Sequence, residues 1–332
     1  MKTFKSKIFL LICLLLSSCL DIEEYENSPQ GNFDALWRIM DERYCFFEYK
    51  DVDWNQIYID YSKRIKSNMD RGALFMLLDE MLQELKDGHV NISSAFNLGR
   101  YWDWYEDYPD NYRQDIIDNY LGTDYLIAGG FRYKILEENI GYLRYADFSS
   151  PFGEGNLDYV IQKFELCDGM IIDVRDNGGG YLTNSEKMAS RFFNEKTLVG
   201  YIQHKTGKGH NDFSKPQPIY IEPSTRLRYQ KQVIVLTNRR CYSTTNDFVN
   251  AMKYAPNCLI LGDKTGGGSG LPFSSELPNG WTVRFSACPI LNAEKEQIEF
   301  GINPDIPVEL TKEDLLKGKD TLIERAIGII KN

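Results

Sequence analysis

The chain has 332 residues, of which 42% are hydrophobic and 26% are charged, and its formal net charge is −10 at pH 7. This composition is typical of a globular protein and excludes a mainly disordered, collagen-like or multi-span membrane chain. The acidic balance disfavours contact with a nucleic-acid backbone, so we expect no nucleic-acid partner. Seven cysteines without CxxC spacing indicate neither a zinc knuckle nor a dense disulfide framework.

Residues 1–18 are typical of a signal peptide. A basic segment, MKTFKSK, precedes the apolar run IFLLICLLL, which is too short to span a bilayer. The following LSSC resembles the lipobox of bacterial lipoproteins. This resemblance implies cleavage before Cys19 and acylation of that residue. The alternative is an ordinary secretory signal that contains a cysteine.

Acyl chains on Cys19 would anchor the protein stably in a membrane, since each buried methylene adds about 0.8 kcal/mol. We therefore expect a lipid-anchored protein of the cell envelope, at the outer membrane on its periplasmic or surface face. Cleavage would remove three lysines and so lower the formal charge by three, from −10 to −13. Residues 19–31 are acidic and polar, which is typical of a tether. Five cysteines would remain besides the acylated one, so at least one thiol is expected to be unpaired or to bond another chain.

Residues 32–90 are expected to form a small helical N-terminal domain. Apolar residues at helical spacing predict helices over 33–47, after the N-cap residue Asp53, and over 74–85 with an end near Gly88. Residues 91–135 form an aromatic-rich connecting segment. Its rings between 96 and 125 either pack on the domain surface or form an exposed platform for sugar or peptide. Their spacing follows no simple period, which favours packing.

Residues 136–332 show strand-like runs that alternate with helix-like stretches. The strand-like runs cover 140–145, 170–174, 233–237, 259–261 and 281–286, and the helix-like stretches cover 156–166, 184–194 and 244–254. This alternation predicts a layered α/β domain with some parallel strands. The sequence Pro278-Asn279-Gly280 predicts a hairpin turn.

Two segments of this domain could carry chemistry. Three glycines at 178–180 follow a strand-like run, so their N–H groups either bind an anion or oxyanion, or the glycines merely form a tight turn. No Gly-Lys-Ser/Thr follows them, which excludes a P-loop. Ser243 stands between a predicted strand and a predicted helix, where it either acts as a nucleophile or caps the helix. Cys241 is a rival nucleophile without a local sign of activation.

Blocks of sequence in a fixed order resemble the tail-specific (C-terminal processing) serine proteases, which include the tricorn-protease core and retinoid-binding relatives. The blocks are LKDGHV at 85–90, GMIIDVRDNGGG at 169–180, VIVLTNRRCYSTTNDF at 233–248, LILGDKTGGGSG at 259–270, LPNGWTV at 277–283 and GINPDIPVEL at 301–310. The resemblance implies the crotonase- and Clp-like layered α/β fold for the catalytic domain. The PDZ module of many processing members is not evident.

The resemblance also implies roles for single residues. Ser243 matches the family nucleophile, and the lysine base of bacterial and plastid members would lie 25 residues later, where this chain has Gly268. A Ser–Lys dyad is therefore not expected. The tricorn-like branch uses a histidine from the N-terminal side, which His89 matches, and a glutamate that orients it, which Glu299 matches. The N–H groups of Gly179, Gly180 and Thr244 would form the oxyanion hole.

We therefore expect a serine endopeptidase that cleaves peptides or proteins at the cell envelope through an acyl-enzyme, without metal or cofactor. His204 and His210 lie in the sequence HKTGKGH, which indicates a solvated loop rather than a metal site. The alternative is a catalytically inactive envelope lipoprotein that binds peptides or other ligands on the same fold. A third hypothesis is a glycan-binding lipoprotein that uses the aromatic residues of 96–125.

Overall fold

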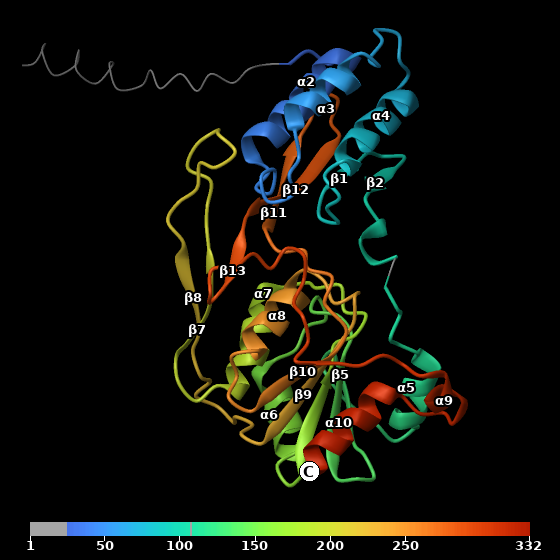
Figure 1. Cartoon of the computed structure of the whole chain (residues 1–332), viewed down its shortest axis with the longest axis vertical. Coiled ribbons are helices and arrows are strands. Elements are labelled where there is room, and N and C mark those ends of the chain that lie inside the picture. Colours follow the sequence, from blue (N-terminus) through green and yellow to red (C-terminus); the bar gives the residue numbers. More distant parts are fainter. Residues whose placement is uncertain (1–24, 107) are drawn as a thin grey trace, which may run out of the picture.

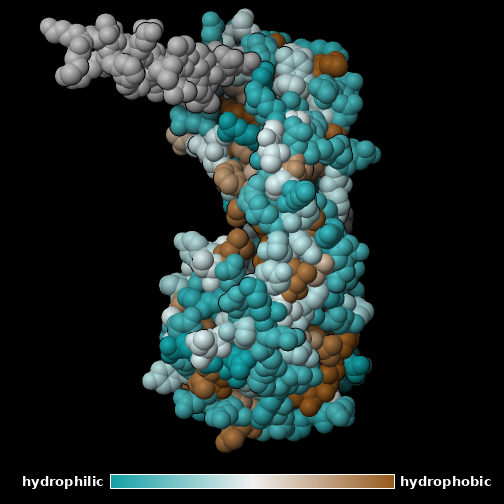
Figure 2. All heavy atoms as spheres, turned by 90° about the vertical axis from the view of Figure 1, so that its left-hand side faces the viewer, coloured by the Kyte–Doolittle hydropathy of each residue, from teal (hydrophilic) through white to brown (hydrophobic). Residues whose placement is uncertain are grey.

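The computed structural model describes residues 25–106 and 108–332. The expected signal peptide and Cys19 lie outside these residues. The chain forms an upper part of helices and a small sheet, and a lower part built around a larger sheet (Figure 1). Figure 2 shows that the molecule narrows between the two parts.

The upper part begins with helices α2 (Pro29–Arg43), α3 (Trp54–Ser62) and α4 (Arg71–Gln83). The side chains of Ser28, Asp53 and Asp70 accept hydrogen bonds from the first turns of these helices, whose N–H groups have no partner within the helix. The end of the expected tether therefore belongs to α2. The third helix ends before Gly88, and Lys86 takes the left-handed backbone conformation instead.

A four-stranded sheet completes the upper part. Its order is β11 (Leu271–Glu276), β12 (Thr282–Cys288), β1 (Asn91–Ser93) and β2 (Leu98–Arg100). The sequence placed residues 271–288 in the catalytic domain, but Trp281 and Phe285 are buried in one cluster with Phe33 and Phe75. The predicted hairpin turn at Pro278-Asn279-Gly280 is confirmed, because Leu277 N–H donates to the Trp281 carbonyl.

The lower part is built on a seven-stranded sheet. Its order is β14 (Ile306–Pro307), β10 (Cys258–Gly262), β9 (Gln232–Thr237), β6 (Gly169–Asp173), β5 (Ile140–Tyr145), β4 (Phe131–Ile135) and β3 (Leu126–Ala128). The first five strands are parallel, and β4 and β3 are antiparallel. Residues 126–135, expected in the connecting segment, therefore belong to this sheet.

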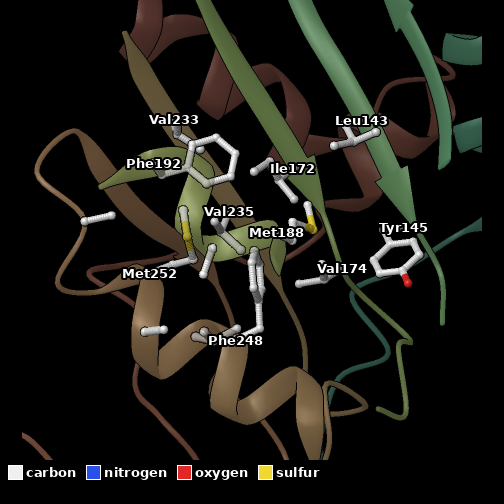
Figure 3. Close-up of a cluster of buried hydrophobic side chains, with 14 of the residues drawn as sticks. Leu143, Tyr145, Ile172, Val174, Met188, Phe192, Val233, Val235, Phe248 and Met252 are labelled. Atoms are coloured by element: carbon white, nitrogen blue, oxygen red, sulfur yellow. The ribbon is translucent and has the colours of Figure 1, made fainter. Parts of the chain in front are cut away.

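Helices cover both faces of this sheet. One face packs against α6 (Glu154–Lys163), α7 (Leu182–Ala189) and α8 (Thr244–Met252), and the other against α5 (Gln114–Leu121) and α10 (Thr321–Lys331). Figure 3 shows Phe248 and Met252 of α8 with Met188 of α7 against Val235 and Ile172 of the strands. The predicted layered α/β fold with a helical N-terminal region is thus confirmed.

The remaining elements are a third sheet and short helices. A three-stranded sheet has the order β13 (Ile290–Asn292), β7 (Thr197–Ile202) and β8 (Gln217–Ile221). The short helical turns are η1 (Asp103–Tyr105) and η2 (Ser190–Phe192), and α9 (Lys312–Leu316) precedes the last helix. Among the helices described, none combines the length and apolar character needed to cross a membrane.

The aromatic segment packs on the lower part through several of its rings. Trp104 stacks on Tyr242 with ring centroids 4.1 Å apart. The Arg239 guanidinium lies 4.0 Å from the centroid of Tyr108, a cation–π contact. These contacts favour the packing interpretation over an exposed platform for these rings. Trp102 remains 47% exposed.

Candidate active site

Ser243 occupies a sharp turn between β9 and α8. Its backbone has φ 58° and ψ −126°, a region that non-glycine residues rarely adopt. Hydrogen bonds hold it there: Ser243 N–H donates to the Gly267 carbonyl at 2.8 Å, and the Ser243 carbonyl accepts from Asp247 N–H at 3.1 Å. The Ser243 side chain makes no capping bond to the helix. The turn therefore holds the hydroxyl outside the helix, as in a nucleophile elbow.

His89 reaches this serine from the upper part of the molecule. It lies between α4 and β1, and its Nε2 is 2.9 Å from Ser243 Oγ although the two residues are 154 positions apart in the chain. The imidazole is buried, and its ring centroid is 5.0 Å from that of Tyr242. A hydroxyl within hydrogen-bond reach of a base is the arrangement that activates a serine.

A buried carboxylate holds the backbone of His89. Asp87 accepts the His89 backbone N–H at 2.8 Å. It also accepts hydrogen bonds from the hydroxyls of Tyr44 at 2.9 Å and Ser286 at 3.2 Å. One of its oxygens lies 3.4 Å from Lys50 Nζ. These contacts come from separate elements, so they fix the loop that carries the imidazole.

Glu299, predicted to orient His89, is buried close to this cluster. One carboxylate oxygen lies 2.9 Å from Lys50 Nζ, and the other has no hydrogen-bond partner among the described residues. His89 Nδ1 is also buried without such a partner in the described part of the chain. The hydrogen bond of Glu299 therefore goes to Lys50 and not to the imidazole, and its role in orienting His89 stays a prediction.

Burial and neighbouring charges set the protonation states of the site. Burial lowers the pKa of His89 to about 4. The positive charges of Arg284 and Arg100 lower this pKa as well, whereas the negative charge of Asp87 raises it. Burial also raises the pKa of Glu299 to about 8, although Lys50 opposes it. His89 is therefore neutral at pH 7, as a general base must be.

The glycine turn after β6 lies beside Ser243. A Cβ added to Gly179 would come within 2.8 Å of Ser243 Cβ. Gly179 N–H donates to Asn177 Oδ1 at 3.0 Å, so one of the three predicted oxyanion donors is already engaged. The N–H groups of Gly180 and Thr244 have no acceptor among the described residues. Both residues line the pocket that contains Ser243, so these two donors fit the predicted oxyanion hole.

The pocket has a volume of about 290 Å³ and lies where the upper and lower parts meet. Among the residues that line it are His89, Gly180, Tyr181, Ser243, Thr244, Asp247, Gly268 and Arg284. Four residues near or in the pocket had no role predicted from the sequence: Asp87, Lys50, Asp247 and Arg284. Only Asp87 carried a signal, because it stands two residues before His89 in Asp-Gly-His and can accept a local backbone N–H.

The other candidates of the sequence analysis lie apart from this chemistry. Cys241 is buried, which raises the pKa of its thiol to about 12 and disfavours the thiolate. All five cysteines of the described residues are free thiols. His210 bonds Asp41 at 2.8 Å and stacks on Phe47, so its loop packs on the upper part instead of being fully solvated. Within the described ranges, no group of His, Cys, Asp and Glu could hold a metal.

Comparison with protein-family models gives two matches. The model of peptidase family S41 matches residues 139–308, which are just over half of the chain. The model of the tricorn protease C1 domain matches residues 25–83. The two regions correspond to most of the lower sheet and to the N-terminal helices.

Individual proteins show the same relationship. The chain is 24% identical over 177 residues to the carboxy-terminal processing protease CtpA of Bacillus subtilis, covering 52% of this chain and 36% of that protein. It is 26% identical over 194 residues to the tricorn protease of Thermoplasma acidophilum, covering 58% of this chain and 16% of that protein. The chain thus spans about a third or less of the length of these relatives.

Solved structures are similar over nearly the whole chain. A crystal structure of a candidate peptidase from Parabacteroides merdae is 57% identical with a TM-score of 0.89, covering 92% of this chain and 98% of that one. Mature CPAF has a TM-score of 0.69 at 14% identity, covering 92% of this chain and 96% of that one, which shows a shared fold. The chain therefore belongs to peptidase family S41, a family of serine proteases.

Proposed function

We propose that this protein is a serine endopeptidase that cleaves peptides or proteins through an acyl-enzyme. The observation that carries the proposal is the 2.9 Å contact between Ser243 Oγ and His89 Nε2 at a strained turn that opens into a pocket. Family membership supports the same chemistry. An inactive binding protein would not need a serine held in an unfavourable backbone conformation beside a neutral imidazole.

The proposed steps use atoms of this chain. Ser243 Oγ attacks the scissile carbonyl carbon while His89 Nε2 takes the hydroxyl proton, and the resulting oxyanion accepts hydrogen bonds from the N–H groups of Gly180 and Thr244. The C–N bond then breaks, and His89 gives its proton to the leaving amine. A water molecule next attacks the ester, with His89 as base again, and this step releases the acid and restores Ser243.

The backbone and packing around Gly268 support histidine as the base. Gly268 has φ 72°, a conformation that favours glycine. A Cβ added there would lie 2.2 Å from the Tyr242 ring, so a lysine side chain has no room. The buried Tyr242 ring thus occupies space next to the position where other family members carry their lysine.

We also propose that Cys19 carries a lipid anchor in the cell envelope. The basic, apolar and small-residue segments before it support this proposal. An anchored enzyme would meet substrates at the membrane surface. The proposal concerns residues outside the described part of the chain and is independent of the catalytic one.

Replacing either member of the proposed pair is expected to abolish activity. Ser243→Ala and His89→Gln should each lower kcat/KM for casein or a peptide by at least about 10³-fold, and both should stop labelling by a fluorophosphonate probe. His204→Gln, a histidine variant outside the pocket, should label like the wild type. Retained cleavage by Ser243→Ala would refute the nucleophile, and an unlabelled wild type would favour the inactive binding protein.

The pH dependence should report the lowered pKa of His89. Because only the neutral imidazole accepts the serine proton, kcat/KM should rise with pH through about 4 and level off about two pH units higher. Arg284→Gln should move this inflection upward, since the charge of Arg284 lowers the pKa of His89. An inflection near the ordinary histidine value of about 6.5 in both proteins would contradict the burial of a functional imidazole.

Installing the family lysine should not create a Ser–Lys dyad. Gly268→Lys should reduce the free energy of unfolding by about 1–3 kcal/mol, measured by urea denaturation, because the backbone and the Tyr242 ring oppose a side chain. The double variant His89→Gln/Gly268→Lys should remain inactive. Gly280→Lys serves as control, because it shares a positive φ but has open space around its Cβ position. Activity in the double variant would show that the site accepts lysine.

The lipid anchor can be tested by metabolic labelling with radioactive palmitate in a bacterial host. The wild type should incorporate label and fractionate with membranes, and Cys19→Ser should do neither. Cys13→Ser is the matched control and should be labelled, because this residue lies in the segment that cleavage removes. Label in Cys19→Ser, or none in the wild type, would contradict the anchor.

A further inference from the structure

Asp247 is a pocket residue that the proposed mechanism does not use. It lies in the first turn of α8, and its N–H donates to the Ser243 carbonyl at 3.1 Å. It lines the same pocket as Ser243 and Thr244. Its Oδ1 atom is fully buried and has no hydrogen-bond partner among the described residues. A buried carboxyl oxygen without a partner is costly unless something binds it.

The charged residue next to Asp247 does not compensate its negative charge. Its charged neighbour is Glu186 of α7, another acid, and neither residue forms an ion pair among the described residues. Burial raises the pKa of Asp247 to about 7, and the charge of Glu186 adds to this effect. Burial also raises the pKa of Glu186. Two neighbouring acids without a cation favour a ligand that supplies one.

A second residue of the pocket fits such a ligand. Tyr181, at the start of α7, lines it and is 63% exposed, so its ring is available to a cation. Arg284 also lines the pocket, but it comes from β12 in the upper part, and no ion pair joins it to Asp247 in the described chain. The pocket therefore has an acidic wall on α8 and a basic wall on β12.

We propose that Asp247 is a specificity-determining residue that binds a cationic group of the substrate, either a Lys or Arg side chain or a free N-terminal amine. This proposal rests on the proposed peptidase function, because it assigns the substrate class of the same pocket. The ion pair forms in a partly desolvated site, where it contributes more than on an open surface.

The preference should affect catalysis as well as binding. Asp247 lies one helical turn from Ser243, so in its ionised form its negative charge destabilises the oxyanion that forms beside Thr244 N–H. A substrate cation would neutralise this charge and leave the oxyanion donors unopposed. A cationic substrate should therefore have a higher kcat as well as a lower KM.

The first test compares N-acetylated peptide coumarin amides that end in arginine or in citrulline, which is similar in shape but neutral. Wild type should prefer arginine by about ten-fold or more in kcat/KM, and Asp247→Asn should lower this ratio to about two-fold or less. Matched peptides with a free or acetylated N-terminus show whether the cation is the terminal amine. The proposal is overturned if wild type hydrolyses both members of each pair equally, or if Asp247→Asn keeps the preference.

The second test separates this proposal from the catalytic one. In Ser243→Ala, a fluorescein-labelled peptide ending in arginine should bind more tightly than its citrulline counterpart, and the further change Asp247→Asn should remove the difference in fluorescence anisotropy. This result would support the cation site even if wild type hydrolysed nothing. Hydrolysis without any charge preference would instead support the peptidase function and contradict the cation site.

Matched variants control for charge and folding. Glu195→Gln removes one acid from an exposed position outside the pocket and should keep the wild-type arginine preference. Asp247→Glu keeps the charge and should retain a measurable preference. Because Asp247→Asn removes an unpaired acid, its thermal unfolding should match the wild type, so a lost preference reflects recognition and not unfolding. A preference equally lost in Glu195→Gln would overturn the assignment.

Discussion

The antiparallel pairing of β1 with β12 is the interaction on which the site depends. The chain leaves the lower part after β10 and enters the upper sheet. There Arg284 of β12 pairs with Asn91 of β1, which lies two residues after His89. Ser286 of the same strand donates to Asp87, which in turn holds the His89 backbone. One strand from the C-terminal half thus fixes the position of a histidine from the N-terminal half. Without this pairing, nothing in the local sequence would bring the imidazole to Ser243.

The second constraint is the parallel pairing of β6 with β9. Their carboxyl ends meet at one edge of the sheet, as is usual for ligand sites in α/β folds. Asn177, just after β6, accepts hydrogen bonds from Gly179 N–H and from the hydroxyl of Thr245 in α8. This one amide ties the glycine turn to the helix that follows Ser243. Ser243 and the proposed oxyanion donors therefore lie on two segments that Asn177 joins.

Buried charges divide into those that serve the fold and those that face the pocket. Asp173 is fully buried but paired with Arg175 at 2.6 Å, and its pKa is lowered, because these contacts outweigh burial. Asp247 lines the pocket without such a cation, and its pKa is raised. The same residue type thus has opposite protonation behaviour in the two settings. Ionisable groups that have a shifted pKa and no partner within the protein indicate ligand sites.

The sequence by itself determined the layered α/β fold and the three N-terminal helices, because these depend on local periodicity. Its short ordered blocks also indicated Ser243 and His89 as candidate site residues. Only the tertiary structure decided what surrounds them. Residues 271–288 join the N-terminal helices because β12 finds its partner in β1. The Gly179 N–H donates to Asn177, and Glu299 forms an ion pair with Lys50. Burial raises the pKa values of Glu299 and Asp247, whereas the charges of Asp87 and Glu299 raise the pKa of Lys50 against the effect of burial. Lys50 and Glu299 are far apart in sequence, and only the tertiary structure brings them together.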